Sequence, residues 1–231
     1  MEFDIKFATQ VRDLIRQGLV YGTGHPAPGQ MCIQAVIQYA MGLPHGDDPK
    51  ECVGAAVRAF GIRLNDARWS SNAARAKGME RFGLAEIGSN SIDQSTFARF
   101  VAEQTIRQIL PIALRSAARL NPKYAEALEE TALRCEKEGT REAALKARRI
   151  ADAAHAAADA AAADAAADYA AYAAADAAAA YAAAYAAYAA YAAAAAAAAS
   201  DQILNLSAEM AVQALAECGS PGCQFLYLTE E

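Results

Sequence analysis

Cysteine, histidine and aspartate residues gather around two neighbouring loops near the start of the chain. His25 lies in a loop rich in glycine and proline, and Cys32 follows it where we expect the first turn of a helix. A helix N-terminus lowers the pKa of a thiol, and a nearby histidine can act as its base. His45 and Asp47 in the next loop would complete a Cys-His-Asp set. One interpretation is therefore a small enzyme using Cys32 with His25 or His45; the other is a cysteine that fills space in the core.

A second pair of candidate ligands stands near the end of the chain. Cys218 and Cys223 are separated by four residues, which fits one half of a zinc site, but no second closely spaced pair is present. The same residues read equally as a helix end at Gly219 followed by a Pro-Gly turn. We therefore expect no metal and no other cofactor, with Cys218 and Cys223 as the candidates if a metal binds.

The segment 64–79 concentrates polar groups around the only tryptophan of the chain. Such a cluster can bind a polar ligand or the end of a partner chain, because Trp and Arg are favoured interface anchors. The alternative is a capped interhelical loop, with Ser70 or Ser71 as the N-cap and Asp66 paired with Arg75. The candidate binding residues are Asn65, Asp66, Trp69, Ser70 and Arg75.

An alanine tract supplies a further candidate surface. Residues 151–199 hold 37 alanines in 49 residues. At 100° per residue, the tyrosines at 181, 185, 188 and 191 fall within about 120° of one another on a helix. Tyr181, Tyr185 and Tyr188 are therefore candidates for binding a partner. The alternative is that these tyrosines, as the bulky residues of the tract, pack against other helices. An ice-binding helix is disfavoured because the tract contains no threonine.

Almost every segment that could position these residues has a helical pattern. Helices are expected over 3–17 and 30–41, from an Asp48-Pro49 start to Asn65, and from Ser71 or Asn72 to Ile87 before Gly88. Further helices should start at Asp93 or Ser95, restart or kink at Pro111, run from an Asn121-Pro122 start to Gly139, open again at Thr140, and span 201–217. We expect an all-α protein, with a bulky core in 1–139 and an alanine-rich hairpin or bundle in 140–231.

Composition narrows the possible partners and compartments. The 231 residues carry 21 basic and 27 acidic side chains, a net charge of -6, with no basic stripe of the kind that nucleic-acid binders use. Five cysteines, an odd number, and an acidic start without a secretory signal indicate a reducing cytoplasm. The 23 uncharged residues 177–199 are long enough for a membrane span, but their alanine content and acidic flanks argue against one. We therefore expect neither nucleic-acid nor membrane partners.

Three groups of residues carry a resemblance to known proteins. They are the string from Leu64, Asn65 and Asp66 through Trp69, Ser70 and Arg75 to Gly78 and Met79; the turn 42–49 followed by Cys52 and Val53; and the ending 221–230. Over most of its length the chain resembles a family of uncharacterised bacterial proteins with Ala-, Asp- and Tyr-rich C-terminal halves. The alanine-rich part also resembles putative immunity proteins of polymorphic-toxin systems, through composition.

Together these patterns predict a non-catalytic intracellular protein that binds through a surface between helices. We expect its partner to be another protein or a second copy of the chain. A toxin-neutralising immunity protein, which the second resemblance implies, and a small enzyme using Cys32 are the alternatives.

Overall fold

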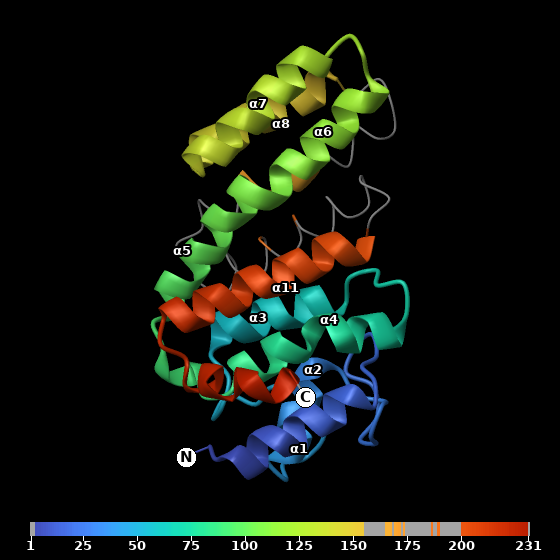
Figure 1. Ribbon diagram of the computed structural model, residues 1–231, viewed down its shortest axis with the longest axis vertical. Helices are drawn as coiled ribbons and strands as arrows, with labels where there is room; N and C mark the ends of the chain where they lie inside the picture. Colours follow the sequence, from blue (N-terminus) through green and yellow to red (C-terminus); the bar gives the residue numbers. More distant parts are fainter. Residues whose placement is uncertain are drawn as a thin grey trace.

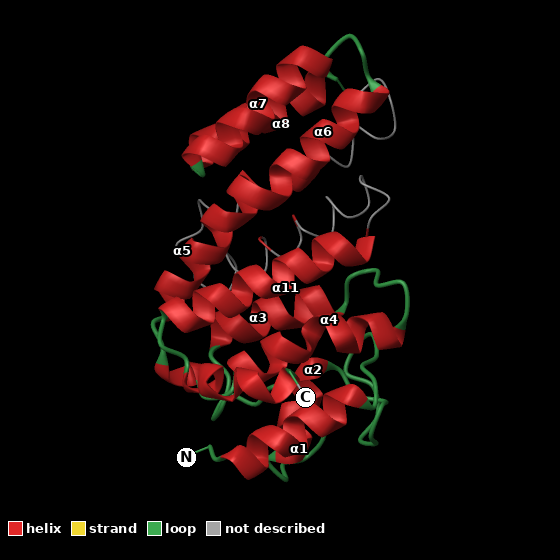
Figure 2. Ribbon diagram, viewed as in Figure 1, coloured by secondary structure: helices red, strands yellow, loops and turns green. Residues whose placement is uncertain are grey.

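Every regular element in the described residues is a helix, as the sequence predicted (Figures 1 and 2). The computed structural model describes residues 3–154 and 200–230, together with 165–167, 169–171, 173, 186 and 189. The α-helices are α1 (Ile5–Arg16), α2 (Ile33–Ala40), α3 (Ala55–Asn65), α4 (Asn72–Ala85), α5 (Gln94–Gln104), α6 (Leu110–Leu120), α7 (Ala125–Glu138), α8 (Arg141–Ala153) and α11 (Ser200–Glu217). The shorter elements are the 3-10 turn η1 (Ser89–Ser91), the π turn η2 (Thr105–Ile109) and the 3-10 segment η3 (Pro221–Thr229).

The helices form two groups that α5 and α6 connect (Figure 1). Helices α1 to α4, α11 and η3 make the lower group, in which α4 packs against α1, α11 and η3. The chain then continues through α5, η2 and α6 to the upper group, which consists of α7 and α8. Helix α7 packs against both α6 and α8. Because α11 returns to pack on α4 and α5, the end of the chain lies beside its first half.

The lower core is built from bulky side chains that three helices contribute. Phe60 of α3 packs against Phe82 of α4 with ring centroids 5.8 Å apart, and against Phe97 of α5 at 6.2 Å. All three rings are fully buried. Each buried side chain of this size stabilises the fold by about 1.5–3 kcal/mol relative to its exposed state. The aromatic cluster thus holds the helices that carry the candidate site.

Local capping signals predicted several helix ends correctly. The side chains of Ser71, Asp93 and Thr140 each accept a hydrogen bond from a backbone N–H in the first turn of α4, α5 and α8. Gly88 and Gly139 follow α4 and α7 with φ of 76° and 62°, in the left-handed region where glycine carries no steric penalty. The restart at Pro111 is also confirmed, since this proline lies in the first turn of α6.

Two predicted helix starts were wrong, because distant groups satisfy the backbone instead. Asp48 does not cap a helix: residues 49–53 form a turn, and α3 begins at Ala55, where the Gln94 side chain accepts from the N–H of Ala56 at 3.0 Å. Asn121 ends α6 rather than starting α7, and its Nδ2 donates to the carbonyl of Ala154 at 2.9 Å. Capping by a side chain far along the chain leaves no local sequence signal.

A π turn joins α5 to α6. Pro111 has no N–H to donate, so the regular hydrogen-bond pattern cannot pass through this point. The five residues of η2 accommodate the interruption, and the Oγ1 of Thr105 donates to the carbonyl of Val101 at 2.7 Å. The helical path therefore continues across the proline with one turn wider than the rest.

The predicted tyrosine stripe lies outside the described residues, as does most of the 177–199 segment. Within the parts that the structure describes, no helix is long and apolar enough to cross a membrane. Of the alanines described between 165 and 189, Ala165 is half-buried and the others are buried, in agreement with packing through small side chains.

Candidate functional site

The polar cluster around Trp69 lines an open cleft of about 720 Å³ in the lower helix group. We call this cleft the Trp69 pocket. It combines predicted residues with residues that the sequence did not single out. Its lining residues are Tyr21, Arg63, Asp66, Ala67, Arg68, Trp69 and Arg75.

Trp69 is fixed in place on one side of the pocket. Its side chain is 7% exposed, and its Nε1 donates to the carbonyl of Leu64 at 2.9 Å. Gly78 of α4 makes room for the indole, because a Cβ at that position would lie 2.4 Å from the ring. The tryptophan therefore forms a rigid apolar wall.

Asn65 lies beneath the pocket as a structural clamp rather than as a lining residue. It is fully buried at the end of α3. Its Oδ1 accepts from the N–H of Ile33 at 3.2 Å, and its Nδ2 donates to the carbonyl of Val20 and to Asp66 Oδ1, both at 2.9 Å. The amide joins α3 to the start of α2 and to the loop after α1, so it is already committed to the fold.

Arg75 reaches from α4 into the same network. Its side chain is 6% exposed; Nε donates to the carbonyl of Asn65 at 2.7 Å, and Nη1 donates to the carbonyl of Leu19 at 3.2 Å and to the side chain of Asn72. Burial lowers the pKa of this guanidinium, and the negative charge of Asp66 partly offsets that effect. Arg75 is thus a buried cation with a fixed orientation.

Asp66 and Ser70 have partners other than those the capped-loop interpretation gave them. Asp66 Oδ1 accepts from the N–H of Gly22 at 2.9 Å, and no ion pair joins Asp66 to Arg75. Ser70 turns away from the pocket: its N–H donates to Asp201 Oδ1 at 2.8 Å, and its hydroxyl donates to Asp201 Oδ2. Ser71 is the N-cap of α4, as one of the two predicted alternatives had it.

Cys32 has an environment opposite to that expected of a nucleophile. It is the N-cap of α2, and its Sγ accepts from the N–H of Ala35 at 3.4 Å. Burial, with smaller contributions from the negative charges of Asp47 and Asp66, raises its pKa to about 11. The helix N-terminus does not compensate for this, so the expected lowering of the thiol pKa was wrong. A cavity of about 60 Å³ beside Cys32 also touches Asp47 and Asp66.

The two histidines predicted as basic partners of Cys32 lie on the surface, whereas Cys32 is buried. His25 and His45 are both exposed, and Nε2 of His45 lies 3.0 Å from the carbonyl oxygen of Gly24. Asp47 pairs with Arg58 at 2.9 Å. No hydrogen bond connects Cys32 to any of these three side chains within the described residues. The structure brings Asp47 close to Cys32 without assembling a catalytic set.

The two cysteines near the end of the chain do not gather further ligands. Cys218 and Cys223 are free and half-buried. Burial raises the pKa of both thiols, to about 11 for Cys223. In the described part of the chain, no three His, Cys, Asp or Glu side chains lie close enough to hold a metal ion.

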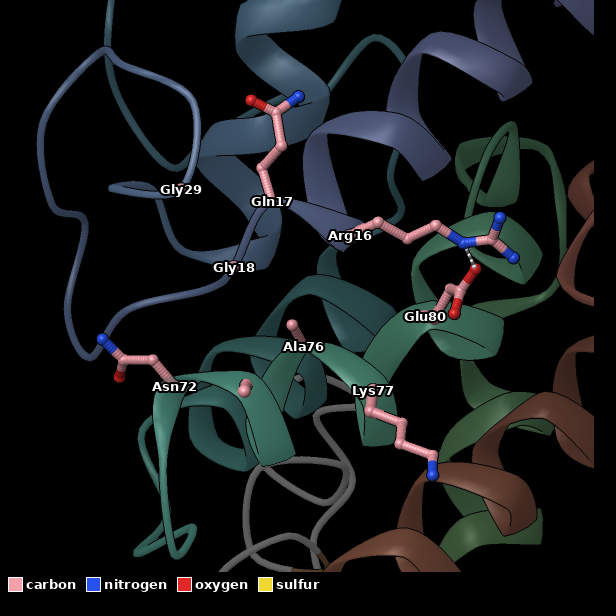
Figure 3. A pocket seen from close by; sticks show the side chains of 9 residues that line it. Arg16, Gln17, Gly18, Gly29, Asn72, Ala76, Lys77 and Glu80 are labelled. Atoms are coloured by element: carbon pink, nitrogen blue, oxygen red, sulfur yellow. Dashed lines mark hydrogen bonds and ion pairs between the residues drawn. The ribbon is translucent and has the colours of Figure 1, made fainter.

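A second cleft, of about 390 Å³, flanks the N-terminal half of α4 (Figure 3). Arg16 of α1 reaches across it to Glu80 of α4, with Nε 2.7 Å from Oε1, whereas the ammonium of Lys77 extends away from this pair. The same cleft is bordered by the backbone of Gly18 and Gly29. Among the described residues that line this cleft, the acid is thus paired with Arg16, and Lys77 points away from both.

Sequence reasoning missed Tyr21, Arg63 and Arg68 as members of the Trp69 pocket. Tyr21 is 70% exposed, and the two arginines are exposed on either side of the end of α3. An exposed tyrosine in a Gly- and Pro-rich loop was the one available signal, since large aromatic side chains there have no core to fill. The chain matches no protein-family model, no curated protein and no solved structure.

Proposed function

We propose that this chain is a non-catalytic binding protein that engages a protein partner through the Trp69 pocket in the cytoplasm. The observation that carries the proposal is the composition of the pocket lining. Two aromatic side chains, Tyr21 and Trp69, share one open cleft with three arginines. Tyrosine, tryptophan and arginine are the residues most enriched at the energetic centres of protein interfaces.

The charge of the pocket favours an acidic partner surface. The lining holds three arginines and one aspartate, in a chain whose net charge is -6. A cationic cleft on an acidic protein attracts acidic segments while the remaining surface repels them, which gives orientation to the encounter. A second copy of this chain meets that requirement, as does a different acidic protein.

Rigid positioning supports binding over catalysis. The side chains of Trp69, Asn65 and Arg75 each donate to a backbone carbonyl, so the cleft exists before a partner arrives. Such preorganisation reduces the entropy that a partner must lose on binding. By contrast, Cys32 has a raised pKa, and no base is hydrogen-bonded to it among the residues that the structure describes. These features favour recognition by a preformed surface.

Site-specific photo-crosslinking tests the proposal. A photoreactive amino acid at Tyr21, which is 70% exposed, should form a discrete adduct in cells of the natural host. The same amino acid at Tyr227, which is 49% exposed on η3, serves as the matched control. An adduct with the mass of a dimer identifies self-association, and another mass identifies a different partner. Equal labelling from both positions, or no adduct at position 21, contradicts the proposal.

A further inference from the structure

One end of the Arg75 guanidinium has no hydrogen-bond partner among the described residues. Its Nε and Nη1 donate to the carbonyls of Asn65 and Leu19 and to the side chain of Asn72, whereas Nη2 makes no hydrogen bond in this part of the chain. Nη2 is also absent from the fully buried atoms that lack partners, so it keeps contact with solvent. Arg75 lines the Trp69 pocket, so a group that enters this pocket meets the guanidinium side chain.

The charge of Arg75 is likewise incompletely compensated. Arg75 as a whole residue is 6% exposed, and no ion pair joins its side chain to another described residue. Burial lowers the pKa of the guanidinium, which reports the cost of removing this cation from water. An uncompensated buried charge is costly, and a hydrogen-bonded anion recovers part of that cost.

We propose that Nη2 of Arg75 receives a carboxylate group of the partner protein in the Trp69 pocket. This inference rests on the proposed function and names the chemical group that the pocket recognises. An N–H of this fixed, charged nitrogen can donate one charge-assisted hydrogen bond to a carboxylate oxygen, which is shorter and stronger than a bond between neutral groups. The indole wall of Trp69 lies in the same pocket and excludes water from one side, which strengthens a charge-assisted hydrogen bond.

The pocket favours a singly charged carboxylate over a doubly charged phosphate. Asp66 lines the same cleft, and its charge acts on Arg75. Repulsion from this carboxylate grows with the charge of the ligand, so a dianion loses more than a monoanion does.

Fluorescence of Trp69 gives a direct test, because it is the only tryptophan in the chain. Sodium acetate, sodium phosphate, acetylglycine and Ac-Glu-NH2 each replace sodium chloride at constant ionic strength. Acetylglycine represents a chain end, and Ac-Glu-NH2 represents an acidic side chain. We expect a saturable change with the carboxylates, and the tighter of the last two identifies which source the pocket prefers. No saturable change with any carboxylate, or tighter binding of phosphate than of acetate, overturns the inference.

Two variants test the role of Arg75 in opposite directions. Arg75→Lys keeps the charge but removes Nη2, and it should weaken acetate binding about tenfold. Asp66→Asn keeps an oxygen for the N–H of Gly22 and removes the competing charge, so it should tighten acetate binding about threefold. Unchanged acetate affinity in folded Arg75→Lys overturns the inference. If that variant fails to fold, Asp66→Asn decides: tighter binding supports the inference and unchanged binding overturns it.

The outcomes separate this inference from the proposed function. Acetate binding that depends on Arg75, without an adduct from position 21, would support the carboxylate site and contradict the proposal of a protein partner. An adduct from position 21 without acetate binding would support a protein partner and contradict a carboxylate as the group that the pocket recognises.

Discussion

Gln34 and Glu86 meet in the core of the lower helix group, where both side chains are fully buried. Nε2 of Gln34 donates to Oε2 of Glu86 at 2.7 Å, while Oε1 of each residue lacks a hydrogen-bond partner. Burial raises the pKa of Glu86 well above its ordinary value of 4.5, and the Gln34 amide only partly opposes this. Glu86 is therefore a buried acid that favours its neutral form.

The first prediction concerns the pH dependence of stability. Because folding raises the pKa of Glu86, the native state binds more protons than the unfolded state above pH 4.5. The contribution of Glu86 to stability is complete below that pH and is lost as the pH rises toward the native pKa, by about 1.4 kcal/mol per pH unit. Glu86→Gln should remove this loss and raise the free energy of unfolding at pH 8.

Urea denaturation of the wild type and Glu86→Gln at pH 5 and pH 8 measures this difference. Glu217→Gln, at an exposed position of α11, is the matched control and should leave the pH dependence as it is. A wild type and a Glu86→Gln variant that lose stability in parallel between the two pH values would show that Glu86 ionises normally.

The second prediction concerns the wall of the Trp69 pocket. Alanine ordinarily stabilises a helix interior by about 1 kcal/mol relative to glycine. At Gly78 the added Cβ would lie 2.3 Å from Oδ1 of Asn205 and 2.4 Å from the Trp69 ring, so Gly78→Ala should instead destabilise by about 1–3 kcal/mol. Displacement of the indole should shift its emission to longer wavelength. Lys77→Ala, on the exposed face of α4, should leave the emission unchanged.

The third prediction concerns the thiols. Cys32 and Cys52 are buried, with pKa values raised to about 11 and about 12, whereas Cys218 is half-buried. In the folded protein at pH 8, Cys218 should react with a disulfide reagent first, and Cys32 and Cys52 should react only on unfolding. Peptide mapping after brief labelling identifies the order. Fast labelling of Cys32 would restore the enzyme interpretation.

The fourth prediction concerns the connection between α5 and α7. Arg107 of η2 donates to the carbonyls of Glu136, Lys137 and Glu138 at 2.9, 2.7 and 3.0 Å. It therefore supplies hydrogen bonds to the last carbonyl groups of α7, which have no partner within the helix. Lysine cannot reproduce this planar set of donors. Arg107→Lys should destabilise the protein by about 1–2 kcal/mol and accelerate amide exchange near the end of α7. Arg99→Lys, on α5, controls for loss of an arginine; equal exchange in both variants would refute the capping role.

The helix ends that could be predicted from the sequence are those whose hydrogen bonds join residues only a few positions apart. The caps at Ser71, Asp93 and Thr140 were predictable because each side chain bonds to an N–H two or three positions ahead. Asp48 and Asn121 misled because of distant residues: Gln94 accepts from the first turn of α3, and the Asn121 side chain binds the carbonyl of Ala154 instead of capping α7.

The same distinction applies to the candidate site. Asp66, Trp69 and Arg75 were found because they lie within ten residues of one another, whereas Tyr21 reaches the pocket only through the fold. The buried pair of Gln34 and Glu86 joins residues 52 positions apart, and neither stands out in the sequence. Cys32 was misjudged because the desolvation of a thiol depends on the surrounding helices rather than on its own segment.

The π turn at Thr105–Ile109 holds one residue more than the α turn it replaces, so it absorbs an extra residue between α5 and α6. Deleting one residue of this turn should therefore leave the side chains of α6, including the fully buried Leu114, close to their present directions. A deletion within α6 has no such turn to absorb it and should rotate every later side chain of the helix by about 100°. The segment between α5 and α6 is thus a place where the chain should tolerate the loss of one residue.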